Sequence, residues 1–476
     1  MIDALPAQGV PAEQILAELG ELRAADLPTH GGRLFAYVYD PAVDGLDRLA
    51  RAAYAESAHV NGLDPTAFPS LLAMENALVA AAAKLLGGGP ATVGNVTSGG
   101  TESLILAVKA ARDAHPEIAN PRLVVPGTAH AAFAKAAHYL RVALDTVPVG
   151  PDLRADPAAM AAAIGPDTVL VAASAPSYAH GVVDPIEAIA AFCASRPVRF
   201  HVDACFGGWV LPYLRRLGAD LPAFDLSLPG VTSISVDLHK YAYAPKGVSV
   251  LLHRDAELRL PQYFAYADWP GYTMINPVIS STRSGGPIAA ALATLRHIGD
   301  AGYLELAATT RRAVATLAGA IESTDGVRLF APPESTVVCL ASDGVDLFVL
   351  ADELAGRGWH IQPQLGYRDL PPTIHLTVTA AVGVTAAEFA PALAEAVAAA
   401  RSRGPVELPP ALVEAAGSLT PAMVTPELIE GLAGALGLTD RVGGPMAAVN
   451  TLLDAAPPAL REALLTGFLS LLQRPS

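Results

Sequence analysis

Ser233-Ile-Ser-Val-Asp-Leu-His-Lys-Tyr-Ala-Tyr-Ala-Pro-Lys-Gly247 is the most informative stretch of this chain. It begins with a short apolar run typical of a buried strand, and Lys240 and Lys246 follow that run. The chain has only five lysines among its 31 basic residues. A lysine kept after a strand in so arginine-rich a sequence indicates a role that needs an amine. An amine can lose its proton and form a Schiff base, whereas a guanidinium cannot.

On both sides of this stretch, short apolar runs alternate with helical patterns, which predicts a mainly parallel α/β sheet. After a helix near residues 287–298 the pattern changes to that of a smaller α/β unit. We therefore expect an N-terminal arm (1–60), a large domain (61–298), a small domain (299–400) and a helical C-terminal extension (401–476). The expected strands are 95–97, 123–125, 169–173, 198–202, 233–236 and 248–252, and in the small domain 336–340, 359–362 and 373–378.

The composition is that of a globular protein with a large buried core. Of 476 residues 52% are hydrophobic, 16% are charged, and the formal net charge is −15. So acidic a chain disfavours nucleic acid or an anionic membrane as partner. No uninterrupted apolar run approaches the ~20 residues of a membrane span, and no signal-peptide pattern begins the chain. Cys193, Cys205 and Cys339 fit neither a disulfide framework nor a metal site. We expect a cytoplasmic protein without a metal.

Four pieces of site chemistry follow successive strands. Residues 97–102 (Thr-Ser-Gly-Gly-Thr-Glu) would hold a phosphate at a helix N-terminus, although alone they are equally consistent with an ordinary glycine turn. His130, at a helix start, would stack on an aromatic cofactor, but a lone histidine is more often a surface or core residue. Asp203 ends a strand and would keep a pyridine nitrogen protonated, although such a residue is more often a turn or cap. Lys240 completes the set.

The order of these pieces is more informative than any one of them. A phosphate loop, a ring-stacking histidine, a carboxylate for the pyridine nitrogen and an amine follow one another along a single α/β unit. This arrangement predicts an enzyme that binds pyridoxal 5'-phosphate (PLP) through Lys240.

The chain also resembles a known family, the sphingosine-1-phosphate lyases of the group II PLP-dependent decarboxylase superfamily. The resemblance spans residues 30–400 and extends more loosely into the tail. It implies the aspartate-aminotransferase-like fold (PLP fold type I), with a mainly parallel seven-stranded sheet in the large domain and a small α/β domain. The segments that carry it are 61–69, 97–103, 128–137, 174–185, 201–208, 239–247, 282–286, 358–359 and 371–375.

The resemblance also implies roles for individual residues. Lys240 would bind the cofactor covalently, Asp203 would face its pyridine nitrogen and His130 would stack on its ring. The remaining cofactor contacts implied are those of Gly100, Thr101 and His239 with the phosphate. The implied substrate-facing residues are Tyr39 and Tyr243, which could relay protons, and Lys246 and Arg283, which carry positive charge.

One departure from the family bears on the substrate. Where the lyases have a histidine that helps bind the substrate phosphate, this chain has Asp64. A carboxylate repels a phosphate, so Asp64 bears directly on whether the substrate is phosphorylated. His59 lies nearby in sequence and would supply a compensating group. By analogy with the fold we also expect a homodimer, with residues near Ser281–Arg283 reaching into the neighbouring subunit's site.

Two reactions and one non-enzymatic role remain open. The first is retro-aldol cleavage of an amino alcohol, such as a sphingoid base phosphate, to an aldehyde and phosphoethanolamine. The second is α-decarboxylation of an L-amino acid, in which Arg283 would grip the carboxylate. The third is a binding or assembly module that has lost catalysis. The complete set of Thr101, His130, Asp203 and Lys240 argues against that third role.

Overall fold

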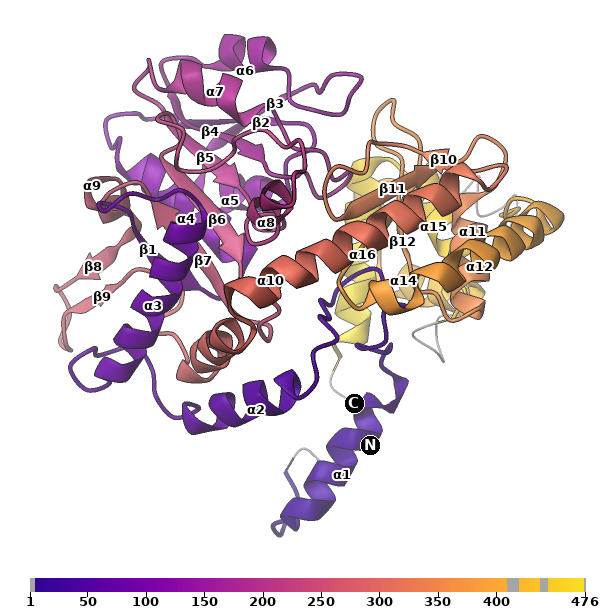
Figure 1. The fold of residues 1–476 in the computed structure, drawn as a ribbon, viewed down its shortest axis with the longest axis horizontal. Helices are drawn as coiled ribbons and strands as arrows, with labels where there is room; N and C mark the ends of the chain where they lie inside the picture. The colour runs from indigo at the N-terminus through magenta and orange to yellow at the C-terminus, as the bar shows by residue number, and fades with distance from the viewer. Residues whose placement is uncertain (1–4, 409–418, 437–443, 475–476) are drawn as a thin grey trace.

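The computed structural model describes residues 5–408, 419–436 and 444–474 (Figure 1). Its larger unit is centred on a seven-stranded sheet of order β1-β7-β6-β5-β4-β2-β3. Strand β7 is antiparallel to β1 and β6, whereas all other pairs are parallel, which confirms the mainly parallel sheet. The strands are β1 (Val93–Thr97), β2 (Arg122–Pro126), β3 (Ala143–Val147), β4 (Thr168–Ser174), β5 (Arg199–Asp203), β6 (Ser233–Asp237) and β7 (Ser249–His253).

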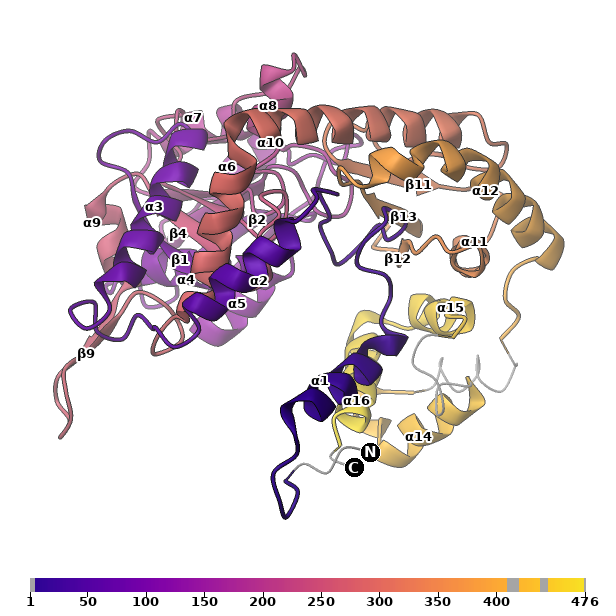
Figure 2. The ribbon, with the colours of Figure 1, turned by 60° about the horizontal axis from the view of Figure 1, so that its bottom comes forward.

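Helices cover this sheet, and the strand at 143–147 was not among those expected from the sequence. A hairpin of β8 (Phe264–Tyr266) and β9 (Met274–Asn276) projects from the unit (Figures 1 and 2). The helices of this unit are α3 (Pro69–Leu85), α4 (Gly100–Asp113), α5 (Ala132–Leu140), α6 (Pro157–Ala163), α7 (Ile186–Cys193), α8 (Leu211–Arg216), α9 (Ala256–Arg259) and the short η2 (Leu260–Gln262).

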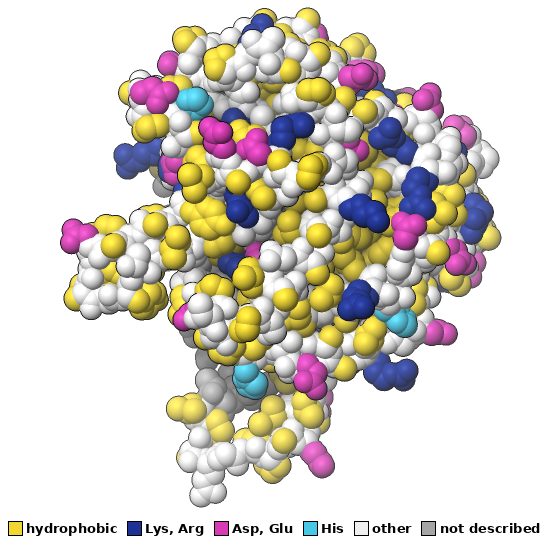
Figure 3. All heavy atoms as spheres, turned by 60° about the vertical axis from the view of Figure 1, so that its left-hand side comes forward, with side chains coloured by type: hydrophobic (Ala, Val, Ile, Leu, Met, Phe, Trp, Pro, Cys, Tyr) yellow, Lys and Arg dark blue, Asp and Glu magenta, His cyan; other side chains and the backbone are white. Residues whose placement is uncertain are grey.

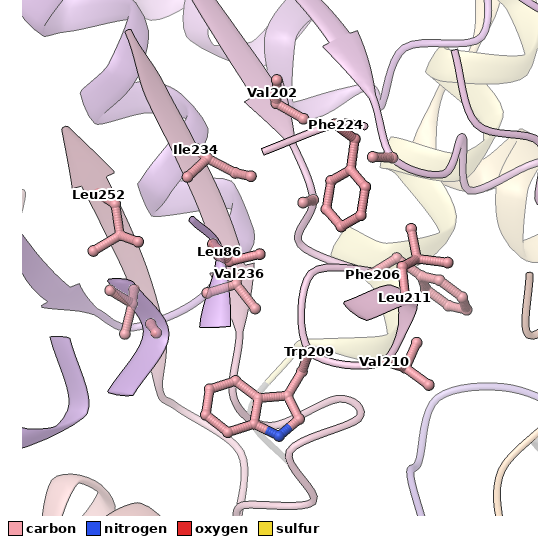
Figure 4. Close-up of a cluster of buried hydrophobic side chains, with 14 of the residues drawn as sticks. Leu86, Val202, Phe206, Trp209, Val210, Leu211, Phe224, Ile234, Val236 and Leu252 are labelled. Atoms are coloured by element: carbon pink, nitrogen blue, oxygen red, sulfur yellow. The ribbon is translucent and has the colours of Figure 1, made fainter. Parts of the chain in front are cut away.

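The central strands are anchored by a continuous apolar core. Val202 of β5 and Ile234 and Val236 of β6 are fully buried, and they face Trp209 and Phe224 in the segment that links the two strands (Figure 4). Each such side chain contributes about 1.5–3 kcal/mol by leaving water. This packing fixes where the carboxyl ends of β5 and β6 lie.

Helix α10 (Gly285–Glu322) connects the two units and breaks at Gly299, whose φ of 63° is readily adopted only by glycine (Figure 1). The smaller unit has an antiparallel sheet of order β10-β11-β13-β12. The strand expected at 359–362 begins only at Gln362, because the backbone of His360 pairs with Arg33 and Phe35 instead. The elements are β10 (Arg328–Leu329), β11 (Val337–Ala341), β12 (Gln362–Gln364), β13 (Thr373–Thr377), α11 (Leu347–Gly356) and α12 (Val382–Arg403).

Among the described residues only α12 is long and apolar enough in composition to cross a membrane. Its Phe389 and Leu393 are fully buried in the core of the smaller unit. A place in a protein core therefore accounts for its apolar composition.

The chain ends add further helices. Helix α1 buries none of its residues. Acidic and basic side chains are interspersed with apolar ones on the face drawn in Figure 3. The terminal elements are α1 (Ala12–Leu22), η1 (Arg23–Ala25), α2 (Leu46–Glu56), η3 (Pro421–Met423), α14 (Pro426–Ala435), α15 (Ala447–Ala455) and α16 (Pro458–Leu472).

Candidate active site

A cavity of about 440 Å³ opens at the carboxyl ends of the central strands. The sheet brings together residues that are far apart in sequence, because each follows a strand of the same sheet. The lining includes every residue for which we predicted a cofactor contact, together with Lys246. These residues are Gly100, Thr101, His130, Asp203, His239, Lys240 and Lys246.

One wall of the cavity is the N-terminus of α4, which begins at Gly100. A β-carbon added to Gly100 would lie 2.8 Å from Cys205 Sγ and 3.0 Å from the carboxylate of Asp237, so no larger residue fits there without a shift. The unpaired backbone N–H groups of a helix N-terminus favour an anion. This wall therefore suits a phosphate group.

Lys240 lies in an ion pair that the sequence analysis did not anticipate. Its Nζ is 3.0 Å from Asp237 Oδ2, and the other oxygen of Asp237 accepts a hydrogen bond of 2.7 Å from Ser249. Burial alone would lower the pKa of Lys240, but the charge and hydrogen bond of Asp237, together with Cys205 and Asp203, outweigh burial and raise it. Conversely, burial opposes ionisation of Asp237, but Lys240 and His239 lower its pKa. An acidic residue three positions before the lysine was the available sequence signal.

Asp203 and His130 both line this cavity. Asp203 is buried at the end of β5, where its Oδ1 accepts a hydrogen bond of 3.1 Å from the Cys205 backbone N–H. His130 Nδ1 accepts one of 3.1 Å from the Ala132 backbone N–H, which orients the ring. Tyr178, a second residue that the sequence analysis did not single out, meets His130 edge to face at 6.3 Å.

Lys246 lines the cavity on the side of the predicted tyrosines, Tyr39 and Tyr243. Lys246 Nζ is 5.1 Å from the centroid of the Tyr39 ring. Burial and the charge of Lys240 lower the pKa of Lys246. Lys246 and His239 also line a second hollow of about 400 Å³, and Tyr39 and Tyr243 lie in that hollow and not in the lining of the first.

Two predicted substrate residues lie outside both hollows. Arg283 Nη2 is 2.6 Å from Oε2 of Glu75, a buried carboxylate whose other oxygen accepts a hydrogen bond from the Val96 backbone N–H. Asp64 is exposed, and its Oδ1 accepts hydrogen bonds from the backbone N–H and hydroxyl of Thr66. Their two loops nevertheless adjoin, since the Gly62 N–H donates to the Arg283 carbonyl at 3.0 Å. The predicted substrate contacts of Arg283 and Asp64 stay predictions.

The donor set of the first cavity fits PLP. It combines an amine, a buried carboxylate, an imidazole and a helix N-terminus in one hollow. Among the residues that the structure describes, no group of three or more His, Cys, Asp or Glu is placed to hold a metal ion.

Sequence comparison agrees with this chemistry. The family pattern described as "Pyridoxal-dependent decarboxylase conserved domain" matches residues 29–341. The chain belongs to the pyridoxal-dependent decarboxylase family. A second pattern, "Pyridoxal-dependent enzyme, C-terminal putative HTH domain", matches residues 410–471, part of which lies outside the described residues. Family membership makes this a PLP-dependent enzyme of the lyase and decarboxylase group.

Within the family, the chain is a homologue of the sphingosine-1-phosphate lyases. It is 37% identical to sphingosine-1-phosphate lyase 1 of Rattus norvegicus over 79% of this chain, and the match spans 66% of the rat enzyme's length. The solved sphingosine-1-phosphate lyase of Burkholderia pseudomallei superposes with a TM-score of 0.80 at 35% identity, covering 85% of this chain and 94% of that one. This likeness confirms the PLP fold type I architecture.

A relative with a different named activity also aligns. The "Probable L-tyrosine/L-aspartate decarboxylase" of Methanocella arvoryzae is 33% identical over 74% of this chain and 90% of its own length. Similarity therefore places this chain in the family but leaves its substrate undetermined.

Proposed function

We propose that this protein is a carbon–carbon lyase that cleaves a phosphorylated amino alcohol, such as a sphingoid base phosphate, to an aldehyde and phosphoethanolamine. The observation that carries the proposal is the second amine, Lys246, at the cavity that also holds Lys240. An ammonium group at the position of Lys246 would bind a substrate phosphate. Burial and the charge of Lys240 lower the pKa of Lys246, and a phosphate bound beside it would offset both effects. The identity with sphingosine-1-phosphate lyases supports the same assignment.

The residues of the cavity would divide the work as follows. Bound PLP supplies an electron sink for the bond that breaks at the substrate's Cα. The N-terminus of α4 binds the cofactor's phosphate, and Asp203 holds a proton on its pyridine nitrogen. His130 confines the ring from one side, while the Lys240 amine holds the cofactor and exchanges protons with the substrate.

Tyr39 is suited to give a proton rather than to take one. Burial raises the pKa of Tyr39 well above its ordinary value, and the nearby Tyr178 and Asp237 raise it further. Its hydroxyl therefore stays protonated at neutral pH. We assign the removal of the substrate's β-hydroxyl proton to the unprotonated form of the Lys240 amine, and the donation of a proton to Cα of the amine product to Tyr39.

The alternative, α-decarboxylation, depends on a group that binds the substrate carboxylate. Arg283 was the candidate for that role, but in this chain it is paired with Glu75 and does not line the cavity. A second subunit would offer another way to bring Arg283 to a substrate, because the adjoining loops of Asp64 and Arg283 lie outside the cavity of their own chain. We therefore include in the proposal a homodimer in which these loops complete the neighbouring site.

One assay distinguishes carbon–carbon cleavage from α-decarboxylation. Purified PLP-loaded protein is incubated with a phosphorylated long-chain amino alcohol and, separately, with a panel of L-amino acids, and aldehyde and CO2 are measured. We expect aldehyde and phosphoethanolamine from the first and no CO2 from the second. CO2 from an amino acid, without aldehyde from the amino alcohol, would establish the decarboxylase instead.

A further inference from the structure

The cavity wall formed by Tyr178 is held from the smaller unit. Its hydroxyl donates a hydrogen bond of 2.7 Å to Gln362 Oε1, and its ring stacks on His375 at 4.5 Å between centroids. Gln362 and His375 face each other across β12 and β13 in the antiparallel register. A cross-strand pair of the small sheet therefore grips a residue that lines the cavity beside His130.

Strand β12 has a second connection to the same loop. Gln364 Nε2 donates hydrogen bonds of 2.8 Å to the carbonyl of Ala179 and of 3.0 Å to Thr373 Oγ1. However, β12 is a three-residue edge strand with Pro363 at its centre, so its own ladder supplies few hydrogen bonds. The position of β12 therefore depends on what fixes its ends.

The far end of β12 is fixed by the C-terminal segment. The backbone N–H of Gly366, two residues after the strand, donates a hydrogen bond of 2.6 Å to Asp454 Oδ1 on α15. Next to it, Tyr367 reaches the larger unit, since a β-carbon added to Gly127 would lie 3.7 Å from the Tyr367 hydroxyl. The carboxylate of Asp454 thus holds the loop that follows β12, and this loop reaches the larger unit through Tyr367.

Helix α15 is itself firmly placed. Both oxygens of Asp352 on α11 accept backbone N–H groups at its start, from Met446 at 2.8 Å and Ala447 at 3.0 Å. Ala447 is buried in the core of the smaller unit. At the other end, Arg461 donates to the carbonyls of Leu453, Asp454 and Ala456. Asp454 therefore presents its carboxylate from a helix anchored at both ends.

We propose that Asp454 is a positioning residue for the active site. Through Gly366, β12 and Gln362, it sets the orientation of Tyr178 against the bound cofactor. The C-terminal helical segment would then act on the cavity wall from outside it. The inference concerns the cofactor pocket and holds whichever substrate the enzyme cleaves, so it can fail or succeed independently of the proposed function.

The test compares Asp454→Ala with Asp454→Asn in PLP-loaded protein. The alanine variant removes the acceptor, whereas asparagine retains an oxygen for the Gly366 N–H. We expect Asp454→Ala to speed amide hydrogen exchange over residues 362–367 by about two- to ten-fold, the loss of one hydrogen bond, and to weaken the circular dichroism of the cofactor's visible band. Asp454→Asn should retain both properties. Glu430→Gln, which alters an exposed carboxylate paired with Arg474 on the same segment, should change neither.

A double-mutant cycle tests the route. Tyr178→Phe keeps the ring but removes the hydroxyl that Gln362 holds, so adding Asp454→Ala to it should change the circular dichroism no further. Fully additive changes, or faster exchange with unaltered circular dichroism, would overturn the proposal. If Asp454→Ala does not fold, Asp454→Glu moves the acceptor by one methylene and should produce the same two changes.

Discussion

The cofactor end and the predicted substrate end of the site are built in different ways. At the cofactor end, Asp203 and Lys240 follow buried strands of one sheet and meet in one hollow. Asp64 and Arg283, which are predicted to face the substrate, lie on adjoining loops that do not reach that hollow. The packed core of a single chain thus places Asp203 and Lys240. Asp64 and Arg283 would reach a substrate only in the site of a neighbouring subunit, as proposed above.

The first prediction concerns Lys240, at the cofactor end of the site. Lys240→Ala should lower the cleavage rate by about ten-thousand-fold or more, since it removes both the covalent link and a proton-transfer group. Lys240→Arg is the cleaner variant, because it keeps a cation beside the buried Asp237 yet cannot bind PLP covalently. The measurements are turnover and the cofactor retained after borohydride reduction. Lys84→Ala, at an exposed lysine, is the matched control. A Lys240→Arg protein that still retained reduced cofactor would remove the basis for the assignment.

The second prediction concerns the substrate end, where the structure gives Arg283 a structural partner. Arg283→Ala leaves the buried carboxylate of Glu75 without its cation and should lower the free energy of unfolding by about 3–5 kcal/mol. Chemical denaturation measures this change. Adding Glu75→Gln should restore much of the stability, because an amide needs no counter-charge. If Arg283→Ala raised KM without loss of stability, Arg283 would serve the substrate rather than the fold.

The same contrast explains what the sequence could predict. Strand β5 pairs with β6 in parallel register, with Asp203 opposite Ser235, and both strands are buried except at Arg199. A residue that ends one strand therefore lies near a residue that follows its neighbour. Because apolar runs reveal the strands, the cofactor residues could be grouped from sequence alone.

Other features depend on contacts that leave no periodic pattern. Asp237 pairs with Lys240 only because both side chains turn into the cavity, and Tyr178 lines it because Gln362 and His375 hold its ring from another unit. The strand at 143–147 is half-exposed at a sheet edge and lacks a long apolar run. Tertiary packing, rather than local pattern, decides each of these.

The third prediction removes the charge of Asp203 and keeps the size of its side chain. In Asp203→Asn the amide oxygen can still accept the Cys205 N–H, so the fold should persist. Without a negative charge beside the pyridine nitrogen, turnover should fall by about 10²- to 10³-fold, as when one preorganised electrostatic group is lost. Borohydride should still fix the cofactor to Lys240. Unchanged turnover in this variant would mean that Asp203 does not face the pyridine nitrogen.

The fourth prediction concerns Asp64 and has the smallest expected effect. The hydrogen bonds from the Thr66 side chain and backbone lower the pKa of Asp64, so it is charged at neutral pH. Asp64→Asn removes the charge and keeps the oxygen that accepts from Thr66, which preserves the loop.

If the loop of Asp64 completes a neighbouring subunit's site, losing its charge should lower KM for a phosphorylated amino alcohol by about two- to five-fold, the range for exposed charges. KM for the non-phosphorylated analogue should not change, and neither should KM in Asp343→Asn, which alters an exposed carboxylate of the smaller unit. If Asp64→Asn changed KM for neither substrate, Asp64 would not approach the substrate phosphate. The substrate end of the site would then have to be built from Lys246 and Tyr39 alone, within one chain.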